Sequence, residues 1–359
     1  MDPRIERYAA LLVDYCIEVK PRMQVVVVST PLARPLYEEV VRQVARRGAF
    51  AIPRIMFGRS VLSERAWLAE APEELVGELA PIERHLAEQV EAVIAIDAPE
   101  NTRADSALSS ERLTKAQEAG RPLLDRVAAH EIPWVLCQYP TQALAQEAGM
   151  SLYDFEEVLY AACLIDWEAE GERMRRIAAR IQAAEELRFV GRDTDLRVRL
   201  AGRRVDASAG KYNMPDGEVY FPPLEDSVEG HVSFGEFPAV HDGRELRGIR
   251  LRFEGGRVVD ASAETEEAFL HEVLDTDEGS RRLGEVGIGC NPGVTRYMKN
   301  TLFDEKIDGT AHFALGNSYT DLGGLNESAI HWDIVKDLRR GGRIDADGEP
   351  IQVDGAWKL

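Results

Sequence analysis

The residues whose types and spacing could support chemistry lie in the second half of the chain. His331 and Asp333 are two residues apart in His-Trp-Asp, and on a strand both side chains would point to the same face. An imidazole and a carboxylate on one face can bind one divalent metal ion, with Trp332 packed on the other side. The alternative is a half-buried strand that ends in a polar surface pair, which is common for so short a pattern.

Four further residues are candidate ligands, and each has a structural alternative. His312 lies in an otherwise apolar segment, so it is either a metal ligand or a core histidine hydrogen-bonded to the backbone. Glu218 and Glu285 each stand beside valine and glycine, which fits either a buried ligand or a solvent-facing strand residue. Glu305 lies in a charged stretch, which favours a surface position.

Together, two histidines and four carboxylates form the ligand inventory of a two-metal hydrolase site. Carboxylates can bridge two ions, and imidazole nitrogens suit zinc or cobalt. Two ions about 3.5–4 Å apart can activate one water and polarise a carbonyl group. The chain contains no H-E-x-x-H motif, so these residues by themselves predict only a metal site in an α/β protein.

The first half of the chain predicts a parallel sheet with helices around it. Short apolar runs alternate with longer amphipathic stretches, which is the pattern of strand, helix, strand, helix. The predicted strands are residues 24–29, 50–55, 92–96 and 133–137, and the predicted helices are residues 32–47, 64–88 and 110–129. No G-x-G-x-x-G follows the first strand, so a dinucleotide-binding domain lacks its phosphate-binding element.

The pattern changes after a long helical region at residues 151–187, which we interpret as the bridge between two domains. Alternating runs on either side of Gly255-Gly256 predict a hairpin, and residues 343–357 predict another. One helix is expected near residues 265–275. We therefore predict an α/β domain over residues 1–187 and a strand-rich, mostly antiparallel domain over residues 188–359.

The composition of the chain indicates which partners and which cellular compartment to expect. The 359 residues carry a formal charge of −20, which argues against nucleic acid as a partner. The strongly apolar run at residues 25–28 is far too short to span a bilayer, and no signal peptide is recognisable, so no membrane partner is expected. Four widely spaced cysteines indicate a reducing compartment, so we expect a cytoplasmic protein.

The same candidate residues carry a resemblance to a known family. The motifs are Asn213-Met-Pro-Asp-Gly-Glu218, Leu283-Gly-Glu285, Thr301-Leu-Phe-Asp-Glu305, Ala311-His312-x-Ala-Leu-Gly316, His331-Trp-Asp333 and Val353-Asp-Gly-x-Trp357. In this order, and nearly from end to end, the chain resembles the M29 metalloaminopeptidases. Two stretches depart from the family pattern. The segment between Glu305 and His312 is longer, and Asn317-Ser318 stands where Arg-Ala is more usual before Tyr319.

The resemblance implies a site and a fold. Glu218, Glu285, Glu305, His312, His331 and Asp333 fall on metal ligands of the family, and Tyr319 falls on an active-site tyrosine. The implied fold is an α/β N-terminal domain with a mostly parallel sheet, followed by a strand-rich α+β C-terminal domain that carries a two-metal site. The implied cofactors are two divalent ions per chain, zinc first and cobalt or magnesium as alternatives.

The implied function is an aminopeptidase that removes N-terminal residues from short peptides with a free N-terminus. The resemblance also implies a homodimer with an enclosed site. Glu285 would bridge the metals or act as a base near the activated water, and Tyr319 would donate to the oxyanion. Two alternatives remain at this point: a nucleotide- or metabolite-binding α/β protein, and a metal-binding protein without turnover.

Overall fold

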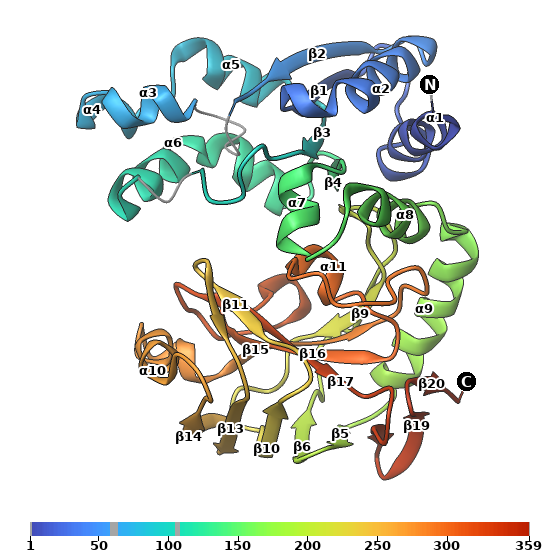
Figure 1. The fold of residues 1–359 in the computed structure, drawn as a ribbon, viewed down its shortest axis with the longest axis vertical. Coiled ribbons are helices and arrows are strands. Elements are labelled where there is room, and N and C mark those ends of the chain that lie inside the picture. The colour runs from blue at the N-terminus through green and yellow to red at the C-terminus, as the bar shows by residue number, and fades with distance from the viewer. Residues whose placement is uncertain (1, 58–63, 105–107, 359) are drawn as a thin grey trace. The chain divides into compact units, whose positions relative to one another are not determined.

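A computed structural model describes residues 2–57, 64–104 and 108–358, and its chain forms two compact units. The first unit contains residues 1–164 and 210–215, and the second contains residues 165–209 and 216–359. Figure 1 shows the elements of each unit along the colour-coded chain.

The first unit is built on a parallel five-stranded sheet, as the sequence predicts. Its strand order is β2-β1-β3-β4-β8, and every pairing in it is parallel. The strands are β1 (Gln24–Ser29), β2 (Phe50–Ile55), β3 (Ala92–Asp97), β4 (Trp134–Gln138) and β8 (Asn213–Met214). The short strand β8 comes from the middle of the chain, and the sequence analysis does not anticipate its return to this sheet.

Helices accompany these strands in the expected alternation. They are α1 (Pro3–Ala10), α2 (Arg34–Arg46), α3 (Arg65–Glu70), α4 (Glu73–Val76), α5 (Pro81–Gln89), α6 (Ser110–Ala128), α7 (Gln142–Glu147) and α8 (Leu152–Cys163). The prediction of a single helix at residues 64–88 is wrong in one respect, because three short helices occupy that range. Pro72 and Pro81 explain the breaks, since the residue before a proline is disfavoured in a helix.

The helical region at residues 151–187 consists of two helices, and the second one belongs to the second unit. Helix α8 ends at Cys163, and α9 (Trp167–Gln182) begins after Asp166, whose carboxylate caps it. Helix α9 packs against strands β7 (Asp206–Ser208) and β9 (Glu218–Phe221). The second compact unit therefore begins at Ile165, ahead of the boundary expected at residue 188.

The second unit contains two antiparallel sheets and a hairpin. An eight-stranded sheet has the order β14-β13-β10-β6-β5-β18-β19-β20, and a five-stranded sheet has the order β17-β16-β15-β9-β7. The remaining elements are β5 (Glu186–Gly191), β6 (Thr194–Arg199), β10 (Glu229–Phe234), the hairpin β11 (Ala239–His241) and β12 (Arg244–Leu246), β13 (Ile249–Glu254), β14 (Arg257–Ser262), α10 (Glu267–Leu274), β15 (Leu283–Gly289), α11 (Thr301–Asp304), β16 (Thr310–Gly316), β17 (His331–Asp337), β18 (Arg343–Ala346), β19 (Glu349–Val353) and β20 (Ala356–Trp357).

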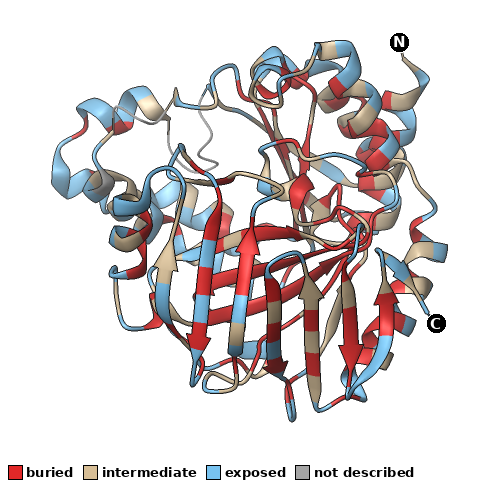
Figure 2. Ribbon diagram, turned by 60° about the horizontal axis from the view of Figure 1, so that its bottom comes forward, coloured by how far each residue is buried: buried red, intermediate tan, exposed pale blue. Residues whose placement is uncertain are grey.

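The two sheets differ in burial, which shows where the core of the second unit lies. Strand β13 alternates between buried and exposed residues, whereas β15 and β16 are buried at every position (Figure 2). These two adjacent strands of the antiparallel five-stranded sheet are therefore covered on both faces. Polar residues on such a sheet need partners, because burying an unpaired polar group is costly.

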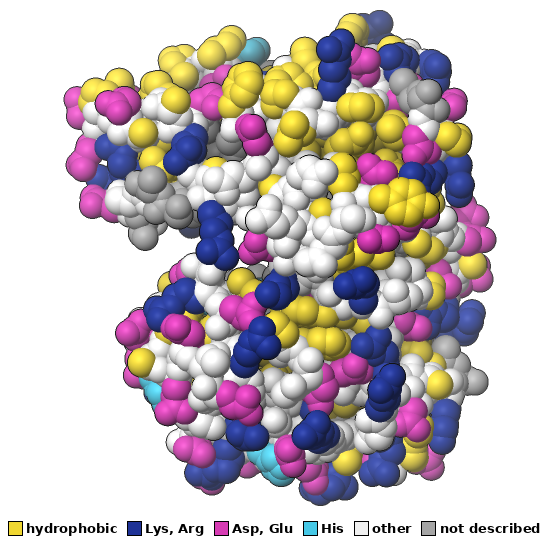
Figure 3. Space-filling model, in the orientation of Figure 1, with side chains coloured by type: hydrophobic (Ala, Val, Ile, Leu, Met, Phe, Trp, Pro, Cys, Tyr) yellow, Lys and Arg dark blue, Asp and Glu magenta, His cyan; other side chains and the backbone are white. Residues whose placement is uncertain are grey.

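The surface mixes charges of both signs. On the face drawn in Figure 3, acidic and basic side chains are interspersed over both units. Within the described residues, no helix is long and apolar enough to cross a membrane.

Candidate metal centre

One face of the antiparallel five-stranded sheet in the second unit carries five of the six candidate ligands. Residues paired across neighbouring strands point to the same face, and so do residues two apart on one strand. His312 pairs with Gly287, and the residue two beyond it, Ala314, pairs with both Glu285 and Asp333. Register and spacing thus place one set of side chains together: Glu218, Glu285, His312, His331 and Asp333.

The opposite face of this sheet is mostly apolar and packs in the core, with the buried Lys336 as an exception. Phe313 lies on β16 between His312 and Ala314, and its ring is 5.1 Å from the ring of Phe189 and 6.2 Å from that of Phe234. Both partners belong to the eight-stranded sheet. Packing of Phe313 between the sheets therefore directs His312 to the other side, where the carboxylates lie.

Glu285 faces both histidines. Its Oε1 lies 3.5 Å from His312 Nε2, and its Oε2 lies 3.1 Å from His331 Nε2. The side chain is only 4% exposed. A carboxylate whose two oxygens face two different imidazoles has the arrangement of a ligand shared by two ions, and a solvent-facing position for Glu285 is wrong.

Glu218 and Asp333 complete the surroundings of the two imidazoles. Glu218 Oε2 lies 3.3 Å from His312 Nε2, and Asp333 Oδ1 lies 3.6 Å from His331 Nε2. Neither oxygen takes part in a hydrogen bond with any described residue, and neither does His312 Nδ1, although all three atoms are buried. His312 is therefore not the core histidine bonded to the backbone that the sequence allowed.

Glu305 reaches the site from outside the sheet. It follows the short helix α11, whose Asp304 accepts hydrogen bonds from the backbone N–H groups of Met298 and Asn300 at 2.6 and 2.7 Å. The Glu305 side chain is 14% exposed and binds the ammonium of Lys306. The surface position that the charged stretch favoured is therefore wrong.

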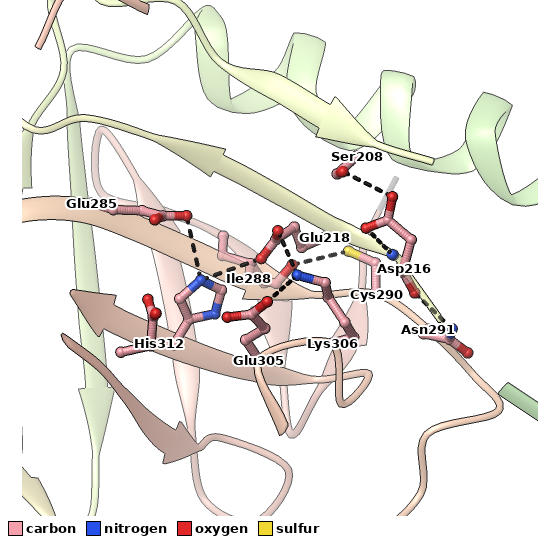
Figure 4. A network of polar contacts seen from close by, with 12 residues as sticks. Ser208, Asp216, Glu218, Glu285, Ile288, Cys290, Asn291, Glu305, Lys306 and His312 are labelled. Atoms are coloured by element: carbon pink, nitrogen blue, oxygen red, sulfur yellow. Dashed lines mark hydrogen bonds and ion pairs between the residues drawn. The ribbon is translucent and has the colours of Figure 1, made fainter. Parts of the chain in front are cut away.

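Lys306 lies between two of the candidate carboxylates. Its Nζ donates to Glu218 Oε1 at 2.7 Å and to Glu305 Oε1, as Figure 4 shows. The sequence analysis missed this residue, because a lysine beside acidic residues is typical of a surface.

The backbone orients His331. Its Nδ1 lies 2.9 Å from the carbonyl oxygen of Asn317, which accepts a hydrogen bond when Nδ1 carries the proton. That tautomer leaves the lone pair of Nε2 facing Glu285 and Asp333. Asn317 contributes its main chain here, so this contact does not depend on the side chain at that position.

Tyr319 packs against the same imidazole. Its ring lies 5.7 Å from that of His331 and 5.3 Å from that of Tyr220, both edge-on, and 37% of the residue is exposed. The charge of Glu285 and burial together raise the pKa of Tyr319 far above its usual value. The phenol therefore keeps its proton and can donate a hydrogen bond.

Three sets of ligand atoms lie close enough to hold an ion. Within each set the ligand atoms are all within 4.8 Å of one another. The sets are Glu218, Glu285 and His312; Glu285, His331 and Asp333; and Glu305, His312 and Asp333. Unpaired buried oxygens and a mixed imidazole and carboxylate donor set fit a divalent cation such as zinc or cobalt.

The electrostatics of this cluster favour bound cations. Burial raises the pKa of Glu218 to about 8, although the ammonium of Lys306 lowers it. Burial acts to lower the pKa of His312, but the contact with Glu285 and the negative charges of Glu218, Glu285 and Asp333 together outweigh this and raise the pKa to about 9. Burial acts to raise the pKa of Glu285, but hydrogen bonds with His312 and His331 and the charges of these two imidazoles together hold it well below its usual value. Carboxylates that lie close together and are buried away from water attract positive charge.

A small cavity adjoins the cluster. Its volume is about 80 Å³, and Glu305 and Asp333 form part of its wall. The other lining residues are Pro238, Ala239, Val240, Tyr297, Lys299, Asn300, Thr301, Asp304 and Val335. The apolar members come from the hairpin β11–β12, the residue before it and strand β17. The cavity can therefore accept a small apolar group next to the candidate ligands.

Comparison with known proteins places the chain in a family. Residues 1–357 match the model of the thermophilic metalloprotease family M29. The chain belongs to the M29 metalloproteases. The resemblance identified from the sequence motifs is thereby confirmed.

Several characterised proteins are similar to this M29 chain. Aminopeptidase 2 of Geobacillus stearothermophilus is 28% identical over 99% of this chain and 98% of that protein. Aminopeptidase T of Thermus aquaticus is 30% identical over 70% of this chain and 73% of that protein. The solved structure of wild-type AmpT from Thermus thermophilus superposes with a TM-score of 0.85 at 26% identity, covering 99% of each chain.

The fold also occurs in a protein with another activity. A 2,5-dihydroxypyridine dioxygenase from Pseudomonas putida KT2440 superposes with a TM-score of 0.62 at 15% identity, covering 99% of this chain and 96% of that one. This likeness shows the fold alone. The function of the M29 chain must therefore be argued from its family and its site.

Proposed function

We propose that this metal-dependent aminopeptidase uses two divalent metal ions to remove N-terminal residues from short peptides. The observation that carries the proposal is Glu285, whose two oxygens face His312 and His331 separately. Glu218 and His312 would hold one ion, and His331 and Asp333 the other, with Glu285 shared. Glu305 would add an oxygen ligand, because it forms a ligand set with His312 and Asp333.

The ions would supply Lewis acidity toward the peptide carbonyl and lower the pKa of a bound water. Around them, the side chains of the protein would fix the geometry. Glu285, whose pKa is held low, would stay ionised between the imidazoles, next to the water. Tyr319 would donate its hydroxyl proton to the oxygen on which negative charge develops. Zinc is the first candidate, with cobalt and magnesium as alternatives, because the site combines nitrogen and oxygen donors.

We propose that the cavity beside Glu305 and Asp333 receives the side chain of the N-terminal residue. Ala239, Val240 and Val335 give it an apolar wall. This small cavity of about 80 Å³ suits a small aliphatic group. The free α-amine would then lie near Glu305 and Asp333 in the wall of the cavity, where positive charge is stabilised.

Two further proposals concern the protein as a whole. The family resemblance supports a homodimer, which light scattering coupled to size-exclusion chromatography tests. The four cysteines are buried and none of them forms a disulfide among the described residues, which supports a reducing, cytoplasmic location. A protein that merely binds a metal or metabolite is not favoured, since the family consists of metalloproteases.

The deciding experiment compares leucine p-nitroanilide with its N-acetylated form, before and after treatment with a chelator. We expect the free amine substrate to be cleaved, the acetylated substrate to resist, and the chelator to abolish cleavage until metal is restored. Cleavage that survives complete metal removal, or equal cleavage of the acetylated compound, would refute the proposal.

A further inference from the structure

Lys306 is a fully buried cation inside the candidate metal centre. Its side chain has an exposed fraction of 0%, and its Nζ binds one oxygen of Glu218 and one oxygen of Glu305 (Figure 4). A buried ammonium is tolerated only when opposite charges and hydrogen bonds replace its hydration. Lys306 therefore has a definite electrostatic task at this position.

The negative charges of the neighbouring carboxylates indicate which electrostatic role Lys306 has. Glu218, Glu285, Glu305 and Asp333 bring up to four negative charges into one buried region. Histidines must be neutral to bind a metal, so they do not offset these charges in the loaded enzyme. The ammonium of Lys306 offsets part of the charge whether or not ions are bound.

The contacts of Lys306 leave one oxygen of Glu218 without a hydrogen bond among the described residues. On Glu218 it binds Oε1, whereas Oε2 faces His312 at 3.3 Å and has no hydrogen bond among the described residues. On Glu305 it also binds a single oxygen, Oε1. One oxygen of Glu218 is thus held by the protein, and the other remains available to a metal ion.

We propose that Lys306 is a positioning residue that acts as a built-in counter-ion of the metal centre. It holds Glu218 and Glu305 together in the folded chain when metal has left, so that the centre loads and releases ions without unfolding. Activity would then follow the availability of the metal reversibly. This inference rests on the proposed function, because it requires Glu218 and Glu305 to be metal ligands.

Lys336 provides a matched control. Its side chain is also fully buried, and its Nζ binds Glu236 and the carbonyl oxygens of Arg192 and Ser233. None of these partners is a candidate ligand. Replacing Lys336 removes a buried ammonium from the same unit without removing a charge that contacts the metal centre.

The test measures thermal unfolding of the full chain and of Lys306→Met and Lys336→Met, each stripped of metal and each saturated with Zn²⁺. We expect zinc to raise the unfolding temperature of Lys306→Met by at least about 6 °C more than that of the wild type, because zinc replaces the missing positive charge. We expect the zinc-dependent rise in Lys336→Met to equal that of the wild type.

A third variant, Lys306→Gln, separates charge from hydrogen bonding, because its amide donates hydrogen bonds but carries no charge. We expect it to behave like Lys306→Met. Equal zinc-dependent rises in Lys306→Met and the wild type, wild-type behaviour of Lys306→Gln, or a Lys306→Met protein that fails to fold even with zinc would each overturn the proposal. If no divalent ion stabilises the wild type, the proposed function itself fails. That outcome is distinct from equal zinc-dependent rises of the unfolding temperature in the wild type and Lys306→Met, which would overturn only the role of Lys306.

Discussion

The imidazole of His312 lies over the backbone of Gly287, in the space that a side chain at residue 287 would need. The two residues are cross-strand partners, and a Cβ atom at Gly287 would come within 2.0 Å of His312 Nε2. Nε2 is also the atom that faces Glu218 and Glu285. The glycine therefore makes room for the histidine in the one orientation that brings it to the carboxylates.

We expect Gly287→Ala to displace His312 and to weaken metal binding by more than about tenfold, since orienting partners of metal ligands are typically worth 10–100-fold in affinity. Metal affinity measured by competition with a chromogenic chelator tests this. Gly77→Ala is the matched control, because a Cβ at Gly77 meets nothing within 4 Å. Unchanged affinity in Gly287→Ala would show that the sheet can adjust around the added methyl group.

Much of this architecture is predictable from local pattern. The strand and helix alternation of the first unit and the hairpin at Gly255-Gly256 follow from short-range periodicity, and both are present. The alternation of side chains along a strand also predicts that His331 and Asp333 share one face, and the register of β17 confirms this. Lys306 could not be found in this way, because its burial depends on carboxylates distant in sequence.

The return of β8 to the first sheet has the same explanation. Two residues of strand carry too little periodicity to be recognised, and their pairing with β4 depends on contacts between residues far apart in sequence. The charged stretch around Glu305 favours a surface position for a related reason, although the family resemblance makes Glu305 a candidate ligand. Its neighbours in sequence are charged, but the fold turns it toward His312 and Asp333.

Asp333 is predicted to be essential for holding metal. We expect Asp333→Asn to weaken metal binding by more than about 100-fold and to abolish most activity, because losing a ligand should cost more than losing an outer partner. Metal content by atomic emission and activity at saturating metal test this. Asp345→Asn is the control, since Asp345 is also buried but pairs with Arg343 on strand β18. Wild-type metal content in Asp333→Asn would remove β17 from the centre.

The cavity makes a prediction about substrate choice. Val240 lines it from the two-stranded hairpin β11–β12, so a larger side chain there is accommodated without rebuilding a central sheet. We expect Val240→Phe to raise KM for N-terminal leucine several-fold while KM for N-terminal alanine changes little, with metal content unchanged. Val259→Phe on β14 serves as the control, because Val259 is exposed and does not line the cavity. Equal effects on both substrates would place the N-terminal side chain elsewhere.

Tyr319 is predicted to act in the transition state. We expect Tyr319→Phe to retain metal and to leave KM within a few-fold, but to lower kcat by roughly 10²–10³, the usual cost of losing one donor to a developing oxyanion. The hydroxyl can serve as this donor because a phenol is protonated at neutral pH, and the charge of Glu285 and burial raise its pKa further. Phenylalanine preserves the edge-on packing against His331 and Tyr220, so a purely structural tyrosine would lose little rate. Tyr220→Phe is the companion variant, since it removes the neighbouring hydroxyl while keeping the same aromatic contact. A kcat in Tyr319→Phe near the wild-type value would leave stabilisation of the oxyanion to the metal ions alone, whereas a loss confined to Tyr319→Phe would assign the proton donor.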